Sequence, residues 1–184
     1  MGNTNHNIRN LKTIEFPNDP FWNFSIHYYS QEKVSDSLLY LQNQYNLDVN
    51  LMLLSIWAGC DNGMCINKDQ FSTLDITANK LQRIVISPLR KIRGDLKPLN
   101  KKNTDELEYL RNSIKDLELF AEHVVQINLS HQLGSFTDIL VTKDHKTAAE
   151  LNLMTYFDYG NMKPTQILFE QKDILIRHAR KKMT

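Results

Sequence analysis

The 184-residue sequence has little of several features that would assign it to a class of protein. It has two cysteines, Cys60 and Cys65, without the two-residue gap and second ligand pair of a zinc site, so we expect two reduced thiols. Its longest apolar run, residues 49–58, is too short for a membrane span. The first twenty residues lack the apolar segment of a secretory signal peptide. These absences predict a cytoplasmic protein that does not contact a membrane.

Neither sign of charge is in clear excess, since 22 lysines and arginines face 21 aspartates and glutamates. This balance is not typical of a protein dedicated to nucleic acid or to membrane surfaces, so any such role must rest on a local cluster. The length fits one domain, which can bury a core without help from disulfides or a metal. We therefore expect a single domain.

The motifs of common catalytic and metal sites are also missing. There is no Gly-x-Ser-x-Gly, no glycine-rich phosphate loop and no Glu-x-x-His of the kind found in di-metal carboxylate bundles. The nearest approach is Glu118 with Glu122 and His123, but neighbouring residues on a helix point about 100° apart. We predict no bound metal and no cofactor, and we favour a non-enzymatic role.

What the sequence does contain is helical periodicity from residue 20 almost to the C-terminus. Asp19 can cap a helix that starts at Pro20, and Asp48 can cap an apolar helix that ends near Gly59. A further helix from residue 68 is expected to break or kink at Pro88. The remaining predicted helices cover residues 33–45, 104–131, 144–159 and 164–181.

These elements predict an all-α fold, a single helical bundle of about six to seven helices with a long central helix near residues 104–131. Along that helix a three–four repeat predicts a core seam of Leu107, Leu110, Ile114, Leu117, Ala121 and Val124, continued by Asn128 and His131. Residues 136–141 have a strand-like composition without a visible partner strand, so we interpret them as an extended connector. Residues 1–17 are polar and aperiodic, which predicts a flexible N-terminal arm before a helical domain over residues 18–184.

A block of residues near the N-terminus resembles a known family. The block consists of Phe21-Trp22-x-Phe24-Ser25, Tyr29, Val34, Leu41-Gln42, Asp48-Val49-Asn50-Leu51 and Trp57. It is similar to that of an uncharacterised family of small all-helical bacterial proteins. A looser match continues through Val85, Pro88-Leu89-Arg90, Arg93, Lys97, Glu118-Leu119, Ala121-Glu122 and Gln126. The resemblance covers residues 20–130, and it implies a family-like core over residues 18–132 and a C-terminal helical extension over residues 133–184.

The resemblance implies a fold and candidate residues but no reaction, because the family has no established activity. It also shows one local departure. The family has Pro-Gly before the valine, where this chain has Glu32-Lys33, and a pair of small residues where this chain has Leu38-Leu39. These differences indicate repacking between the first two helices.

Six polar residues within this region form the candidate ligand-binding set, namely Asp48, Asn50, Arg90, Arg93, Glu118 and Glu122. If the two arginines face the two glutamates, the four residues form an interhelical ion-pair network that fixes the register of the bundle. Alternatively, the arginines bind an anionic ligand, since a guanidinium recognises carboxylate or phosphate through two hydrogen bonds. The sequence leaves both interpretations open.

A second candidate surface is basic and comes from segments 80–102 and 177–182. Its residues are Arg90, Arg93, Lys97, Arg177, Arg180, Lys181 and Lys182, which would suit a nucleic acid. Cations near a helix C-terminus are also favoured by the helix dipole alone.

From the lack of a catalytic motif we favour a non-enzymatic protein-interaction or regulatory module with a protein partner. The sequence supports two alternatives. One is a nucleic-acid-binding protein that uses the basic surface. The other is a protein or enzyme that binds a small molecule or an anionic ligand at a polar site around Asp48, Asn50 and Arg90.

Overall fold

The computed structural model of the chain describes residues 16–98 and 105–179. These residues are mostly helical, in the order α1 (Pro20–Tyr29), α2 (Val34–Tyr45), α3 (Val49–Asn62), α4 (Lys68–Leu81), η1 (Gln82–Ile86, a π-helix), α5 (Ser87–Leu96), α6 (Asp105–Gly134), α7 (His145–Tyr159) and α8 (Gln166–Ala179). Because η1 joins α4 to α5 without a break, these three elements form one continuous helical segment. The described residues therefore contain seven helical segments. The predicted all-α bundle with a long helix is confirmed.

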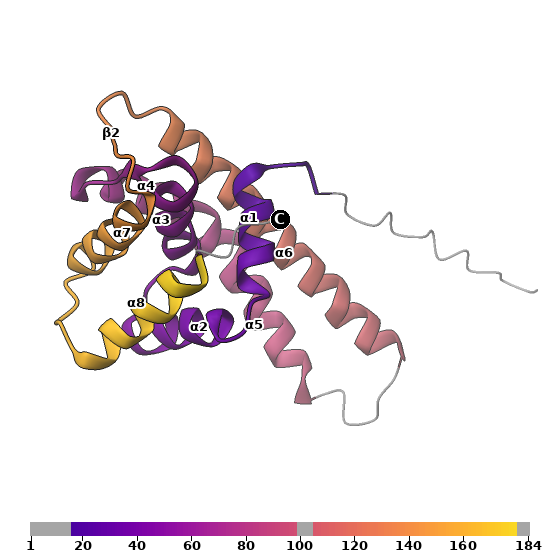
Figure 1. Cartoon of the computed structure of the whole chain (residues 1–184). Coiled ribbons are helices and arrows are strands. Elements are labelled where there is room, and N and C mark those ends of the chain that lie inside the picture. Colours follow the sequence, from indigo (N-terminus) through magenta and orange to yellow (C-terminus); the bar gives the residue numbers. More distant parts are fainter. Residues whose placement is uncertain (1–15, 99–104, 180–184) are drawn as a thin grey trace, which may run out of the picture.

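The centre of the bundle is α3, which contacts α1, α2, α4, α6, α7 and α8. Between Asn50 and Gly59 every residue of α3 except Trp57 is buried. In Figure 1, α6 is the longest helix, and α1 and α5 lie along it. No helix among the described residues combines the length and the apolar character needed to cross a membrane.

Two helices approach each other closely where Gly59 of α3 faces Ala149 of α7. A Cβ atom added at Gly59 would lie 2.2 Å from the backbone nitrogen of Ala149. The predicted end of this helix at Gly59 is therefore wrong, and α3 continues to a C-cap at Gly63, which has a left-handed φ of 63°. Both glycines suit a helix end locally, but packing against α7 requires the first of them inside the helix.

A two-residue strand pair corrects the prediction for residues 136–141. The strand β2 (Leu140–Val141) pairs antiparallel with β1 (Met64–Cys65), in the loop after α3. The buried side chain of Asn152 in α7 supports this loop, because its Nδ2 donates to the carbonyl oxygen of Met64 and its Oδ1 accepts from the backbone N–H of Ile66. The predicted connector therefore has a strand partner more than 70 residues away in the sequence.

The predicted core seam of α6 holds only in part. Ile114 and Ala121 are buried, but Leu110 and Leu117 are 46% and 47% exposed. Towards the C-terminus, Asn128 and His131 are exposed, and the buried positions are Val125, Leu129 and Leu133. The shift of the buried positions towards the C-terminus is expected, because a straight α-helix drifts away from a seven-residue repeat by about 20° per heptad.

Three local features lie at Pro88, at Lys33 and at the start of the described residues. Pro88 does not end the helix but lies in the first turn of α5, directly after the wider π-helical turns of η1. Lys33, where the resembled family has glycine, adopts a left-handed φ of 66° before α2. Of the predicted N-terminal arm, residues 1–15 lie outside the described residues, whereas Phe16 stacks on Trp22 with ring centroids 5.4 Å apart.

The contact between α3 and α7 generates a stability prediction. Replacing Gly59 by alanine forces its Cβ into the backbone of Ala149, so we expect Gly59→Ala to lower the free energy of unfolding by about 3 kcal/mol or more. The matched control is Gly94→Ala in α5, where an added Cβ meets nothing within 4 Å. The free energy of unfolding of that variant should be higher than that of wild type by about 0.5–1 kcal/mol, because alanine has the better helix propensity. Urea unfolding of both proteins checks the pair, and equal stability of the two variants would contradict the described packing.

Candidate functional site

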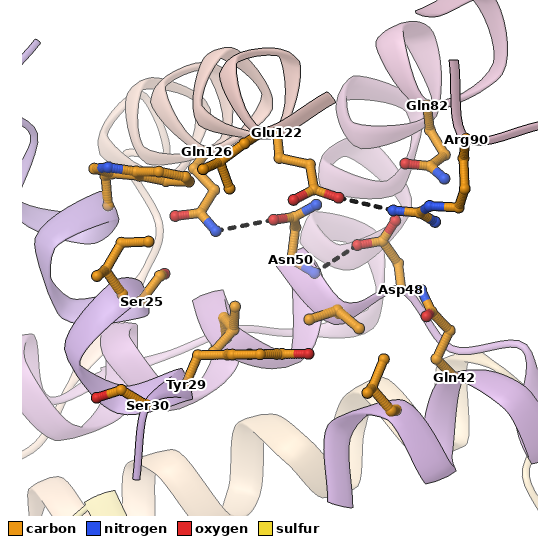
Figure 2. Close-up of a pocket in the computed structure, with 16 residues that line it drawn as sticks. Ser25, Tyr29, Ser30, Gln42, Asp48, Asn50, Gln82, Arg90, Glu122 and Gln126 are labelled. Atoms are coloured by element: carbon orange, nitrogen blue, oxygen red, sulfur yellow. Dashed lines mark hydrogen bonds and ion pairs between the residues drawn. The ribbon is translucent and has the colours of Figure 1, made fainter. Parts of the chain in front are cut away.

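A pocket of about 310 Å³ opens at the N-terminal end of α3 (Figure 2). Its volume is at the lower end of the range of about 300–1,000 Å³ that is usual for ligand pockets. Five helices, η1 and the turns after α1 and α2 supply its lining residues, which are Trp22, Ser25, Ile26, Tyr29, Ser30, Leu39, Gln42, Asp48, Val49, Asn50, Leu53, Gln82, Arg90, Leu119, Glu122 and Gln126. Asp48, Asn50, Arg90 and Glu122 of the predicted ligand-binding set therefore line one pocket.

Asp48 has a structural role as well as a place in the pocket. As predicted, it is the N-cap of α3, and its Oδ1 accepts hydrogen bonds from the backbone N–H groups of Asn50 (2.7 Å) and Leu51 (3.2 Å). Its own backbone N–H donates to the hydroxyl of Tyr156 in α7 at 2.9 Å. Both cap bonds use Oδ1, so capping does not occupy Oδ2 of this carboxylate.

The amides of Asn50 and Gln126 are joined across the pocket wall. Nε2 of Gln126 in α6 donates to Oδ1 of Asn50 in α3 at 2.9 Å, and both side chains are buried. Within the part of the chain that the structure describes, Oε1 of Gln126 and Oγ of Ser25 are buried without a hydrogen-bond partner. Both residues are only 3% exposed, and Figure 2 shows them at the same end of the pocket. The pocket thus contains two buried polar atoms whose hydrogen-bonding capacity is unused.

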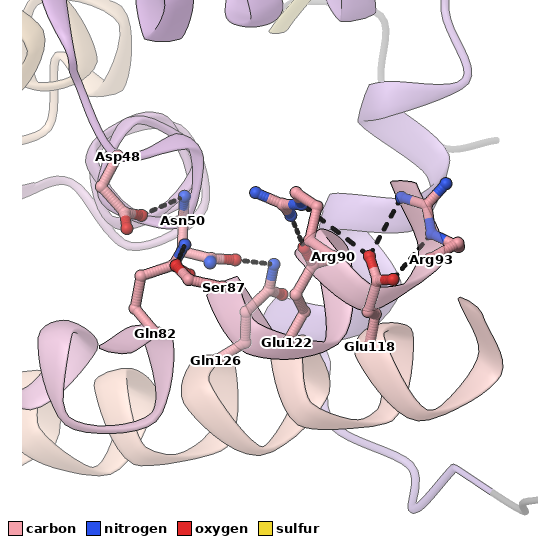
Figure 3. A network of polar contacts seen from close by, with 9 residues as sticks. All are labelled: Asp48, Asn50, Gln82, Ser87, Arg90, Arg93, Glu118, Glu122 and Gln126. Carbon is pink, nitrogen blue, oxygen red and sulfur yellow. Dashed lines mark hydrogen bonds and ion pairs between the residues drawn. The ribbon is translucent and has the colours of Figure 1, made fainter. Parts of the chain in front are cut away.

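The predicted interhelical ion-pair network between α5 and α6 is present (Figure 3). Arg93 binds Glu118 through two bonds, Nε to Oε1 at 2.6 Å and Nη2 to Oε2 at 3.1 Å. Arg90 donates from Nη2 to Oε1 of Glu122 at 2.8 Å, and its Nε lies 3.8 Å from Oε2 of Glu118. Such partly exposed pairs fix register more than they stabilise. Arg93 and Glu118 do not line the pocket and belong to the network alone, whereas Arg90 and Glu122 belong to both the network and the pocket.

The two carboxyl groups in the pocket are poorly stabilised as anions. Burial raises the pKa of Asp48 above its usual value, and the nearby charge of Asp75 adds to the effect, while the cap bonds oppose it. Burial likewise raises the pKa of Glu122, where the positive charge of Arg90 opposes it and the negative charges of Glu118 and Asp48 add to it. With one arginine against two carboxyl groups, the charged residues that line the pocket are acidic in sum.

The other sequence-predicted residues are less concentrated. Of the basic candidates for nucleic-acid binding, Arg90 and Arg93 are engaged by glutamates, whereas Lys97 and Arg177 are exposed. Arg180, Lys181 and Lys182 lie outside the described residues. Over residues 16–98 and 105–179, no group of three or more histidine, cysteine, aspartate or glutamate residues is arranged to hold a metal ion.

Sequence reasoning missed the neutral polar residues of the pocket, chiefly Ser25 and Gln126. A signal for Gln126 was available, since Glu118, Glu122 and Gln126 recur at intervals of four and so share one helix face. No comparable signal exists for Ser25, because it lies in an aromatic helix whose polar positions do not identify the one that faces the pocket.

Comparison with known proteins identifies one family. A family model described as "Protein of unknown function (DUF2390)" matches residues 20–129, which include every residue that lines the pocket. Neither the curated proteins nor the solved structures give a significant match. The resemblance seen in the sequence is therefore confirmed at the level of a family of unknown function, and α7 and α8 lie outside the matched residues.

The raised pKa of Asp48 predicts an unusual pH dependence of stability. A folded-state pKa above the unfolded value stabilises the fold below that unfolded value, and this contribution is lost as pH rises through the folded-state pKa. Asp48→Asn keeps the cap but removes the titration, so its stability relative to wild type should increase as pH rises above about 4. Urea unfolding between pH 3 and pH 7 measures this difference.

Asp144→Asn at the N-cap of α7 is the matched control. Hydrogen bonds from Thr147 lower the pKa of Asp144. The free energy of unfolding of wild type should therefore increase relative to that of Asp144→Asn as pH rises through the range below about 4. The two caps thus predict slopes of opposite sign in different pH ranges. If the free energies of unfolding of Asp48→Asn and wild type change in parallel above pH 4, burial does not raise the pKa of Asp48.

Proposed function

The chain belongs to the DUF2390 family of proteins of unknown function, and we propose that it binds a small organic molecule in the pocket at the N-terminal end of α3. The observation that carries this proposal is the pair of unpartnered atoms, Oγ of Ser25 and Oε1 of Gln126. Buried polar groups in folded proteins are nearly always hydrogen-bonded, and leaving one unbonded costs about 1–3 kcal/mol. A ligand that bonds to both atoms recovers this energy.

The composition of the pocket supports the same function. Ligand pockets are mostly apolar with a few polar groups in fixed positions. Here Trp22, Ile26 and Leu53 supply apolar surface. The polar groups are held before a ligand arrives, since Asn50 is bonded to Gln126 and Asp48 is fixed by its cap bonds. Such preorganisation lowers the entropic cost of binding.

A protein partner is the second candidate function, and one observation favours it. Leu110 and Leu117 of α6 are about half exposed, and their spacing of seven positions places both on the same face of the helix. Exposed apolar side chains that share a face are typical of a surface covered by another protein.

The Leu117→Glu variant tests this second function. If this variant loses a partner that wild type captures, while its thermal stability is unchanged, the result supports a protein-binding surface. Capture that is insensitive to this change would count against such a surface.

We also propose a cytosolic location for this binding protein. The sequence contains two cysteines, Cys60 and Cys65, whereas proteins of oxidising compartments outside the cytosol that depend on disulfides are usually richer in cysteine. The proposal is checked by the fractionation of cells that express the full chain, and recovery in a secreted fraction would contradict it.

Filling the pocket should abolish ligand binding. Ile26 lines the pocket and is 49% exposed, so a tryptophan at this position can occupy the pocket without disturbing the core. We expect Ile26→Trp to lose binding of small fragments that the wild type binds, as measured by saturation-transfer NMR with a library of neutral, anionic and cationic members. Ile167→Trp is the matched control, because Ile167 is 48% exposed on α8 and does not line the pocket.

Three outcomes decide this test. Fragments that bind wild type and Ile167→Trp but not Ile26→Trp support the pocket as the binding site. A library without a single bound member contradicts the proposal, as does binding that persists unchanged in Ile26→Trp while thermal unfolding shows that the variant is folded.

A further inference from the structure

A second cavity of about 380 Å³ adjoins the pocket. Gln42, Asp48 and Gln82 line both, so the two cavities are neighbours on either side of these side chains, and we call them together the combined space. The far wall of the second cavity includes Tyr156 and Tyr159, which lie beyond the part of the chain matched by the family. Helix α7 and the turn after it thus enlarge a site whose first half belongs to the family region.

Acidic side chains line both parts of this combined space. Glu122 lines the pocket, Asp75 lines the second cavity and Asp48 lies where the two meet. Among the lining residues, Arg90 of the pocket is the one basic side chain, and it is already paired with Glu122. Among the described residues, neither Asp48 nor Asp75 forms an ion pair. The positive charge of Arg90 also acts on Asp48, whose pKa it lowers, so one basic side chain serves three carboxyl groups in this space.

The hydrogen bonds of Asp75 leave its charge uncompensated. Its carboxylate accepts from Nδ2 of Asn79 at 2.9 Å and from the hydroxyl of Tyr159 at 3.2 Å, and both donors are neutral. Its negative charge contributes to the raised pKa of Asp48, although burial is the larger cause, and Asp48 contributes in turn to that of Glu122. The central carboxyl group, that of Asp48, is thus repelled by Asp75 on one side and repels Glu122 on the other.

A single metal ion does not match this arrangement. Three carboxylates that share an ion must converge on one point, and no such group of residues occurs in the described ranges 16–98 and 105–179. The carboxyl groups are instead distributed along two cavities whose walls carry the aromatic rings of Trp22, Tyr29, Tyr45, Tyr156 and Tyr159. Aromatic faces attract organic cations, and they also cover hydrocarbon chains.

We propose that the combined space binds a linear aliphatic diamine or polyamine, with its protonated nitrogens distributed between the pocket and the second cavity. This inference rests on the proposed function and specifies its ligand. An ammonium group carries three hydrogen-bond donors and no acceptor, which suits the unpartnered Oε1 of Gln126 and the carboxylates of Asp48 and Glu122. A second ammonium group reaches Asp75 in the second cavity, and the hydrocarbon between the nitrogens lies against the aromatic rings. An anionic ligand would instead have to displace Glu122 from Arg90.

The class of ligand can be tested with four molecules that share a four-carbon skeleton. Butane-1,4-diamine carries two positive charges, butylamine one, butanol none and butyrate a negative charge. We expect calorimetric titration of the full chain to show the diamine binding about tenfold more tightly than butylamine, with no measurable binding of butanol or butyrate. Spermidine, a longer triamine, should bind at least as tightly as the diamine.

Matched variants locate the second charge. Asp75→Asn keeps the hydrogen-bond acceptor and removes the charge, so it should abolish the advantage of the diamine and leave butylamine binding unchanged. Asp116→Asn removes an exposed charge elsewhere on α6 and should change neither affinity. Ile26→Trp should weaken binding of both amines because it fills the pocket.

The outcomes separate this inference from the proposed function. If butanol or butyrate binds as tightly as the diamine, or if only other fragments bind, the ligand class is wrong and the pocket remains a binding site. Equal effects of Asp75→Asn and Asp116→Asn would reduce diamine binding to non-specific charge attraction and overturn the inference. If neither the four compounds nor the fragment library binds, the proposed function fails as well.

Discussion

The burial of α3 on all sides is the constraint on which the rest of the structure depends. A helix without an exposed face cannot direct its polar groups into water, so each needs a partner from another element. Asp48 caps its first N–H groups, Gln126 of α6 bonds Asn50, and Asn152 of α7 donates to the backbone carbonyl of Ser55 at 3.0 Å. The surrounding helices are thus positioned by polar contacts as well as by apolar packing.

The two buried amides that serve α3 differ in a way that separates structure from function. Asn152 uses both ends of its amide, since Nδ2 donates to two carbonyls and Oδ1 accepts from Ile66. Gln126 uses Nε2 alone, and its oxygen remains without a partner beside a pocket. The first pattern completes a packed core, and the second preserves an acceptor for a ligand. Of these two amides, only that of Gln126 leaves its oxygen open to the pocket.

Local sequence signals predicted much of this arrangement. The caps at Asp19 and Asp48 and most helix boundaries follow from residue types within a few positions of each other. The ion pairs between α5 and α6 could also be predicted from the sequence, because spacings of three and four residues place charges on one helix face. The buried face of α6, the β1–β2 pair and the role of Gly59 were not, since each depends on which distant segment packs against it.

The candidate site shows the same division. Its carboxylates and arginines were recognisable by charge, whereas Ser25 and the second cavity depend on helices that meet only in the folded chain. The most direct test of the central claim is an NMR titration that follows the side-chain NH₂ signals as spermidine is added. We predict that the signals of Gln126 and Asn50 shift while that of Asn152, buried on the α7 side of α3, does not. Unchanged signals of Gln126 and Asn50, or an equal shift of Asn152, would contradict the account.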